Sequence, residues 1–350
     1  MEPSTVSTVK QHAQNALIGL AIGDAISWSA MFHRSFLLPQ WTRRIRREID
    51  SASENENVII LPTPFSLNQS SKHFNISPTC GTEWAAFTAN ILLSNNCDFY
   101  EQAVFNMWKE LAKTADTIRG GVSTRAALKN LCNGLNPPQS GKENPHYFDD
   151  FAMPRAVPIG IICAGKPEQA AKLAEIDASI TNSEDGIWAA QAIAVMISLL
   201  CSGKSINYAI DAAYQHLPQA SWIRRIVDEA LLIAQDCESI FSVLPKLQNE
   251  IVNHEYSYGN VAPETLALAI VIIRLHGNNF ESALTVSLSF SKSSETLPAM
   301  IGALAGANQS KLIASENWLN AVSLLKGVCI PSLAGQNYLS LIEQLLTKID

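Results

Sequence analysis

The side chains best suited to chemistry gather at one predicted helix start, within residues 76–93 (ISPTCGTEWAAFTANILL). Thr79 precedes a run of apolar residues at helical spacing, and Glu83 falls in the first turn, where an acid complements the helix dipole. Cys80 lies at the same helix start, a position that favours the thiolate, and His73 is near it in sequence. Because nothing in the sequence brings His73 to Cys80, we expect Cys80 to be a buried or inert thiol.

A cluster of arginines beside Trp41 is the second candidate for chemistry. Planar guanidinium groups bind phosphate or an acidic protein surface through paired hydrogen bonds. A solvated amphipathic helix, with Trp41 and Ile45 on its apolar face, is the alternative interpretation. If the cluster is functional, a partner docks on Arg34, Arg43, Arg44, Arg46 and Arg47.

Glycines mark a third candidate at the start of a helix predicted over residues 122–131. Gly120 and Gly121 follow Arg119, and the free backbone N–H groups of a helix start can receive a phosphate. A plain helix entry that happens to contain glycine explains the same residues.

The elements that must position these candidates are helices. From Thr82 onward, apolar residues recur with helical periodicity between short Gly, Pro or Asn stops, and no convincing alternating strand appears. A helix predicted over residues 263–276 is apolar nearly all round and should be central. Residues 51–77 form a long polar loop inside what we expect to be one all-α domain over residues 1–350.

Small residues at helical spacing occur in residues 16–23 and 302–307. A glycine inside a helix costs about 1 kcal/mol relative to alanine. Repeated glycines therefore indicate either close approach of two helices or backbone beside a ligand. We expect tight helix packing here.

Composition narrows the classes of function. An apolar content of 47% supports a sizeable core, and a net charge of −7 makes nucleic acid an unlikely partner. The N-terminal residues lack a signal-peptide pattern, and the longest apolar run, residues 266–273, is far shorter than the roughly 20 residues of a membrane span. We expect a cytoplasmic protein without a membrane contact. The cysteines, 7 in number and without a CxxC pair, argue against a disulfide framework and a thiolate zinc site.

Taken in order, six segments resemble the ADP-ribosylglycohydrolase family, which includes the dinitrogenase-reductase-activating glycohydrolases and the J1 crystallins. Together they span almost the whole chain. The first resembles the family's N-terminal helix, and the second its Thr-Asp-Asp-Thr helix start. The others resemble a Gly-rich helix entry, the Met-Arg-x-x-Pro-x-Gly segment, the Thr-His helix start and the Gly-Gly-Asp-x-Asp-Thr stretch. The segments are residues 16–26, 78–93, 119–131, 151–161, 177–190 and 291–307.

The resemblance implies a compact, single-domain orthogonal helix bundle with a central cleft that holds two Mg²⁺ ions. In that cleft ADP-ribose is removed from a modified protein side chain or a related compound. Two dications require several carboxylate ligands. The family's five carboxylate positions fall here on Met31, Cys80, Gly81, Ser293 and Glu295, so only Glu295 retains an acid. The family's histidine is replaced as well, by Asn182.

We therefore expect no metal or other cofactor, with Mg²⁺ possible only in a rearranged site. No catalytic residue is assigned, and Glu83 and Glu295 are the remnant candidates. Asp24, in the family's Gly-Asp pair, should have a structural role. The nearby acids that are candidates to rescue a metal site are Asp149, Asp150, Glu184 and Asp185. For Asp149 and Asp150 we expect a solvated loop or an N-cap role instead. The positions implied to bind a ligand are Thr79, Thr82, Gly120, Gly121, Ser123, Met153, Arg155, Asn182, Ser293 and Thr296.

Three hypotheses of function follow from this pattern. The leading one is a catalytically degenerate family member that binds an ADP-ribosyl or other nucleotide-like ligand, or a protein partner. The second is an active hydrolase with a rearranged Mg²⁺ site, or with none, built from Thr79, Glu83, Glu295 and Thr296. The third is a structural or regulatory helical scaffold with a closed cleft.

Overall fold

The computed structural model describes residues 3–31, 77–96, 101–252, 260–311 and 313–349. Across these ranges the secondary structure is helical, and paired extended backbone is limited to two isolated bridges, Asp149 with Val261 and Leu324 with Asn337. The all-α prediction is confirmed. The predicted loop over residues 51–77, the arginine cluster and His73 lie outside the described residues, apart from Ser77 at the end of the loop.

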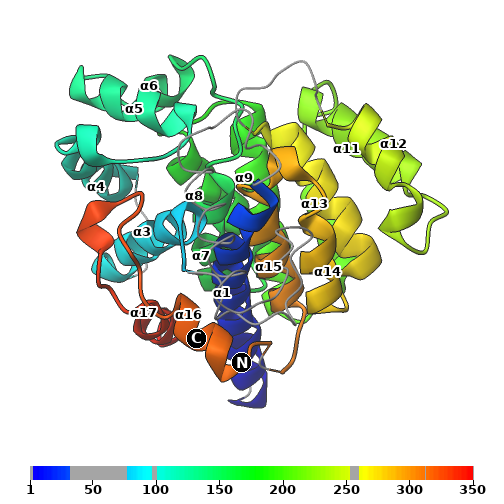
Figure 1. Cartoon of the computed structure of the whole chain (residues 1–350). Coiled ribbons are helices and arrows are strands. Elements are labelled where there is room, and N and C mark those ends of the chain that lie inside the picture. The colour runs from blue at the N-terminus through cyan, green and yellow to red at the C-terminus, as the bar shows by residue number, and fades with distance from the viewer. Residues whose placement is uncertain (1–2, 32–76, 97–100, 253–259, 312, 350) are drawn as a thin grey trace, which may run out of the picture.

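Two antiparallel helices, α1 (Pro3–Met31) and α15 (Leu297–Ala307), form the axis of the molecule (Figure 1). Their backbones touch, because a Cβ added to Gly19 would lie 2.1 Å from the carbonyl oxygen of Gly302. One helical turn further along, a Cβ on Gly23 would lie 2.0 Å from the carbonyl oxygen of Pro298. The expectation of tight helix packing from the glycine spacing is confirmed.

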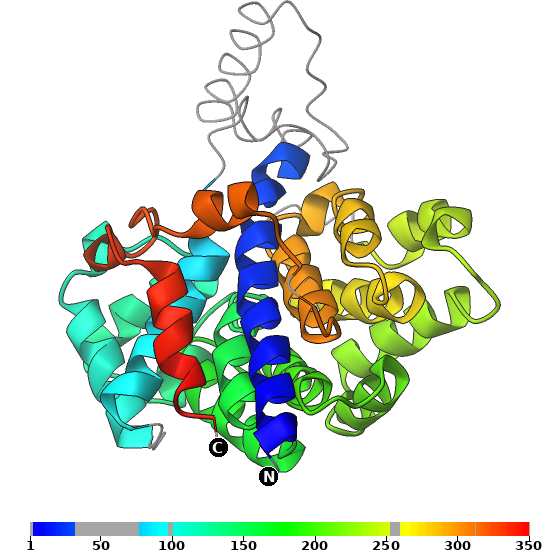
Figure 2. The same ribbon diagram turned by 90° about the horizontal axis from the view of Figure 1, so that it is seen from below.

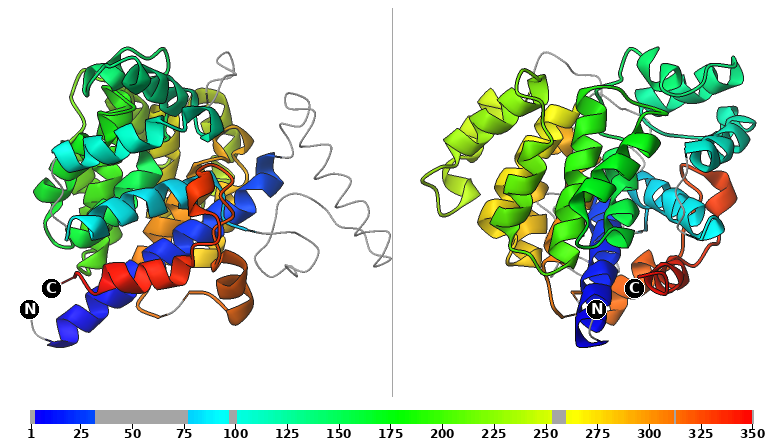
Figure 3. Two further views of the ribbon diagram at one scale, coloured as in Figure 1. Left: turned by 90° about the vertical axis from the view of Figure 1, so that its left-hand side faces the viewer. Right: turned by 180° about the vertical axis from the view of Figure 1, so that it is seen from behind.

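Four further helices surround this axis. They are α3 (Cys80–Ser94), α7 (Met153–Ile162), α9 (Asp185–Cys201) and α13 (Ala262–His276). Seen from behind, α7 and α9 lie across α1 (Figure 3, right). Residues 262–273 of α13 are all buried, so the predicted central helix over residues 263–276 is confirmed.

The remaining helices form two flanks and a C-terminal cover. On one side of the axis lie α4 (Glu101–Ala112), α5 (Val122–Cys132) and α6 (Gln139–Lys142), and on the other α11 (Trp222–Ile233), α12 (Leu244–Glu250) and α14 (Phe280–Ser287) (Figure 1). Helices α8 (Pro167–Ala178) and α10 (Ile206–Gln215) pack against α9. The chain ends with α16 (Glu316–Val322) and α17 (Tyr338–Leu346), and α17 runs beside α1 (Figure 2).

Candidate functional site

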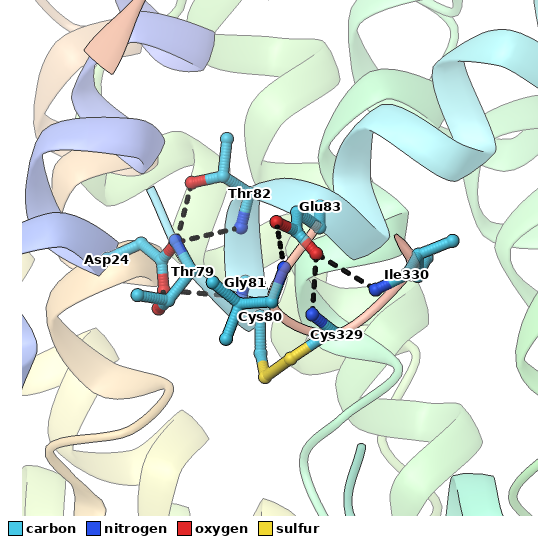
Figure 4. The surroundings of a disulfide bond; sticks show 9 residues. Asp24, Thr79, Cys80, Gly81, Thr82, Glu83, Cys329 and Ile330 are labelled. Carbon is cyan, nitrogen blue, oxygen red and sulfur yellow. Dashed lines mark hydrogen bonds between the residues drawn. A yellow bond between two sulfur atoms is a disulfide. The ribbon is translucent and has the colours of Figure 1, made fainter. Parts of the chain in front are cut away.

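The first turn of α3 is organised around one buried carboxylate, that of Asp24 in α1. Its two oxygens accept hydrogen bonds from the backbone N–H groups of Thr79, Gly81 and Thr82, at 2.7, 3.2 and 3.0 Å (Figure 4). The hydroxyls of Thr79 and Thr82 each donate to the same carboxylate at 2.6 Å. Asp24 therefore caps α3 from a neighbouring helix, and its predicted structural role is confirmed. The hydroxyl hydrogens of Thr79 and Thr82 are used inside the fold.

Gly81 leaves little space for a side chain beside Asp24. A Cβ added at Gly81 would lie 3.1 Å from Oδ1 of Asp24 and 3.5 Å from the Cβ of Ala299. A carboxylate at this position would have to approach the carboxylate of Asp24, and like charges at such distances repel strongly in a buried setting. The side chain of Asp24 would therefore have to shift to admit an acid at Gly81.

Glu83 binds the C-terminal segment of the chain. Its Oε1 accepts the N–H of Val328 at 2.8 Å, and its Oε2 accepts the N–H groups of Cys329 and Ile330 at 2.7 and 2.9 Å. The side chain is fully buried. Glu83 is in the first turn of α3, as predicted, but both oxygens contact a loop 245–247 residues away in sequence. Glu83 was a remnant catalytic or metal-binding candidate, but both of its carboxylate oxygens already accept hydrogen bonds from this loop.

Cys80 forms a disulfide with Cys329, across a sequence separation of 249 residues and a Cα–Cα distance of 5.3 Å (Figure 4). The expectation that Cys80 is a buried or inert thiol was wrong. The odd, scattered cysteines argued against a disulfide framework, and they did not reveal this single pair. Spacing rules detect frameworks of neighbouring cysteines, and a single long-range pair leaves no such pattern. The carbonyl oxygen of Cys329 also accepts the N–H of Arg119 at 2.8 Å.

The glycine-rich entry to α5 lies beside this loop but presents no free anion site. Gly121 precedes the helix, and a Cβ on it would lie 2.4 Å from the ring of Phe151. The N–H of Ser123 donates to Oδ2 of Asp149 at 3.1 Å, and its hydroxyl donates to Oδ1 at 2.7 Å. The carboxylate of Asp149 therefore already accepts hydrogen bonds at the helix start where a phosphate was considered. Gly120 is similarly close to its neighbour Thr124, at 2.9 Å from an added Cβ.

Asp149 is buried, so the solvated-loop interpretation was wrong, and it is not an N-cap residue either, because Gly121 precedes α5 and Ala152 precedes α7. Its carboxylate instead caps α5 from a separate segment of the chain. Its backbone oxygen and Oδ1 also accept the side-chain amide of Asn182, at 3.0 and 3.1 Å. Burial raises the pKa of Asp149, and the hydrogen bonds from Ser123 and Asn182 oppose that rise. Asn182, at the family's histidine position, thus ties the start of α5 to the loop before α9.

Arg155 is fully buried and forms hydrogen bonds inside the core. Its Nε donates to Oδ2 of Asp177 at 2.6 Å, and its guanidinium also donates to the hydroxyl of Thr181 at 2.8 Å. The guanidinium carbon lies 4.9 Å from the ring centre of Trp108, which stacks on Trp84 of α3. Met153, in the first turn of the same helix, is fully buried as well. These implied ligand positions are part of the core.

Asp150 is brought beside the remnant acid Glu295. Its Oδ2 accepts the hydroxyl of Thr265 at 2.6 Å, and its Oδ1 accepts the hydroxyl of Thr296 at 2.9 Å. Burial raises the pKa of Asp150 to about 8, and the nearby carboxylates of Asp149 and Glu295 contribute. The expectation of a solvated loop or N-cap for Asp150 was wrong, because the residue links α13 to the start of α15. No sequence signal distinguished it from Asp149.

The other two rescue candidates lie at the start of α9. Asp185 is buried, and its Oδ1 accepts the N–H of Ile223 at 2.9 Å, which caps α11. Burial raises its pKa. Glu184 is exposed and has a positive φ of 45°, a conformation uncommon for a residue other than glycine.

The side chains available as metal ligands among the described residues do not fit a pair of magnesium ions. Magnesium requires oxygen ligands, largely from carboxylates. Asp24 and Glu83 are engaged by backbone N–H groups, and among the described residues no three His, Cys, Asp or Glu side chains are grouped so as to hold a metal. At the family's carboxylate positions, Ser293 is buried beside half-buried Glu295. Met31 is the last residue of α1.

One open groove of about 510 Å³ lies elsewhere, between α4 and α8 and the loop at Pro137 and Pro138. Phe105 and Ile176 form part of its apolar lining. None of the implied ligand positions contributes to it. The predicted central cleft stays a prediction.

Comparisons with known proteins agree with this architecture. A family model described as ADP-ribosylglycohydrolase matches residues 5–348. A solved structure described as an "ADP-ribosylglycohydrolase-related protein complex" is similar to this chain, with a TM-score of 0.60, 17% sequence identity, and coverage of 98% of this chain and 100% of that chain. At that identity the likeness shows a shared fold. No curated protein matches the chain.

No helix within the described ranges combines the length and apolar character needed to span a membrane.

Proposed function

The chain belongs to the ADP-ribosylglycohydrolase family, and we propose its function on that premise. The proposal is that it is a catalytically degenerate member, without the dimetal chemistry, which acts by binding an ADP-ribosyl or similar nucleotide-like ligand. A protein partner is the other kind of molecule it could bind.

The first turn of α3 is the observation that carries the loss of the metal chemistry. Where the resemblance implies two metal-binding carboxylates, the chain has Cys80, which is used in a disulfide, and Gly81, which is packed against Asp24. Both threonine hydroxyls of the same turn donate to Asp24. Two dications would bring four positive charges to this turn. Its one acid, Glu83, already accepts hydrogen bonds from the loop at residues 328–330.

An active hydrolase is the second candidate, and one contact favours it. Burial is the main cause of the raised pKa of Asp150, the nearby Glu295 carboxylate adds to it, and the hydroxyl of Thr296 donates to Asp150. A carboxyl group with a raised pKa beside a second carboxyl group is the usual arrangement for acid–base chemistry on a glycosidic bond. Thr79 and Glu83, which the same hypothesis includes, have structural partners here.

Thermal unfolding tests the two functions. The protein is measured after chelation, with Mg²⁺, with ADP-ribose, and with both together. Ligand that binds the folded state raises stability by RT ln(1 + [L]/Kd), about 2.7 kcal/mol at a hundredfold excess over Kd. We expect ADP-ribose to raise Tm equally with and without Mg²⁺. A rise that needs Mg²⁺ would refute the degenerate-enzyme proposal, and no rise in any condition would leave the protein-partner function.

A further inference from the structure

The C-terminal segment, residues 323–337, is joined to the first turn of α3 by two kinds of bond. Glu83 accepts three successive backbone N–H groups, from Val328 to Ile330. The Cys80–Cys329 disulfide adds a covalent bond at the centre of the same contact (Figure 4). The segment is held in shape by its own hydrogen bonds, with the N–H of Leu325 donating to Gln336 at 3.0 Å and that of Tyr338 donating to Ser323 at 2.7 Å. It therefore attaches to α3 as a preformed unit.

The two sulfur-bearing residues differ in exposure. Cys329 is fully buried, whereas Cys80 is half-buried at the first position of α3. Because Cys80 is the more exposed residue of the pair, we expect an external thiolate to attack the sulfur of Cys80, with Cys329 as the leaving group. The second thiol of a dithiol reductant then attacks the mixed disulfide and releases Cys80. A thiolate on Cys80 is favoured by the positive end of the helix dipole.

We propose that the Cys80–Cys329 disulfide is a redox-sensitive latch that fastens residues 323–337 over the start of α3. Reduction consumes two electrons and two protons: a dithiol is oxidised to its disulfide while Cys80 and Cys329 become two thiols. The segment is then held by non-covalent contacts, among them those of Glu83, the bond between Arg119 and Cys329, and the paired side-chain amides of Gln336 and Asn90 in α3, and such contacts open reversibly. Thr79 and Cys80 at the start of α3 become accessible when they do.

The ligand of the proposed function plays no part in this inference. Disulfides persist in oxidising compartments and are reduced by thiol systems in the cytosol. A protein that meets both conditions would have two states, one with the start of α3 covered and one in which the cover opens. The free cysteines Cys132, which is exposed, and Cys237, which is half-buried, provide internal controls.

The experiment uses the full chain with and without dithiothreitol. Alkylation before and after reduction, followed by peptide mass spectrometry, reports the state of each cysteine. Amide hydrogen exchange reports the opening of the segment at Val328, Cys329 and Ile330, whose N–H groups bind Glu83. We expect Cys80 and Cys329 to resist alkylation until reduction. Exchange at the three amides should then rise by roughly tenfold or more, while exchange in α13 stays unchanged.

Two matched variants make the result decisive. Cys80→Ser should exchange like the reduced protein without any reductant, and Cys132→Ser should behave like the unaltered oxidised protein. If Cys80 is alkylated in the oxidised folded protein, the disulfide is absent and the proposal fails. If the disulfide is present but its reduction leaves exchange at the three amides unchanged, the bond is not a latch. Far-UV circular dichroism of Cys80→Ser separates loss of the latch from loss of the fold.

Discussion

Replacing Glu83 by glutamine should strongly destabilise the protein, although the two side chains have nearly the same shape. The amide nitrogen of Glu83→Gln can donate but cannot accept, so at least one of the three N–H groups of the loop loses its acceptor. In the better orientation the amide oxygen keeps the bonds to Cys329 and Ile330, and Val328 is left facing a second donor.

The magnitude follows from the charge of the acceptor. A hydrogen bond to a charged group contributes about 1.5–3 kcal/mol, and losing the one to Val328 costs about that amount. The other two bonds become neutral and lose roughly half their strength, which adds another 1.5–3 kcal/mol or so. The expected loss in the free energy of unfolding is therefore about 3–6 kcal/mol, a large part of the stability of an ordinary domain.

Urea unfolding followed by circular dichroism measures this loss. Glu101→Gln is the matched control, because Glu101 occupies the first turn of α4 with an exposed side chain. An exposed acid interacting with the helix dipole contributes only about 0.3–1 kcal/mol. A Glu83→Gln protein within 1 kcal/mol or so of the control would refute the role of Glu83 as the anchor of the loop. Loss of an Mg²⁺-dependent thermal shift at unchanged stability would instead identify Glu83 as a metal ligand.

Two further substitutions test the site and its protonation. Gly81→Asp should lower stability by more than about 2 kcal/mol without creating a Mg²⁺ response in thermal unfolding, because the added group lies against Asp24. Gly81→Asn separates the steric part of that loss from the electrostatic part, and a stable, Mg²⁺-responsive Gly81→Asp protein would contradict the expectation. The raised pKa of Asp150 means that the folded state holds a proton from about pH 4 to about pH 8 that the unfolded state has released. Its contribution to stability therefore falls as pH rises through that window, by up to about 1.4 kcal/mol per pH unit. Urea unfolding at pH 5, 6.5 and 8 should show this fall in the unaltered protein and a shallower one in Asp150→Asn, and equal slopes would contradict the assignment.

The helical frame was largely predictable from the sequence because its signals are local. Apolar residues at helical spacing placed the helix at 263–276, and the structure has it at Ala262–His276. Gly19 and Gly302 indicated close helix contact, and the structure shows their backbones touching. Each of these signals depends on residues within a few turns of one another.

The candidate site was predictable only in its outline. The resemblance identified the start of α3 and the missing carboxylates at Cys80 and Gly81. It could not show that Arg155 and Asn182, implied to bind a ligand, are buried in hydrogen-bonded contacts inside the core. Nor did it separate Asp149, which caps α5, from its neighbour Asp150, which links α13 and α15. Adjacent residues of one type differ here because their side chains reach different helices.

The sequence by itself determined the all-helical architecture and the family, and the resemblance implied the loss of acids at the metal positions. Only the tertiary structure decided what replaced them. Glu83 and Cys80 meet a loop about 245–249 residues further along the chain, and no local rule of spacing or propensity relates positions so far apart. Their pairing depends on folding of the helices between them, which brings residues 328–330 to the first turn of α3.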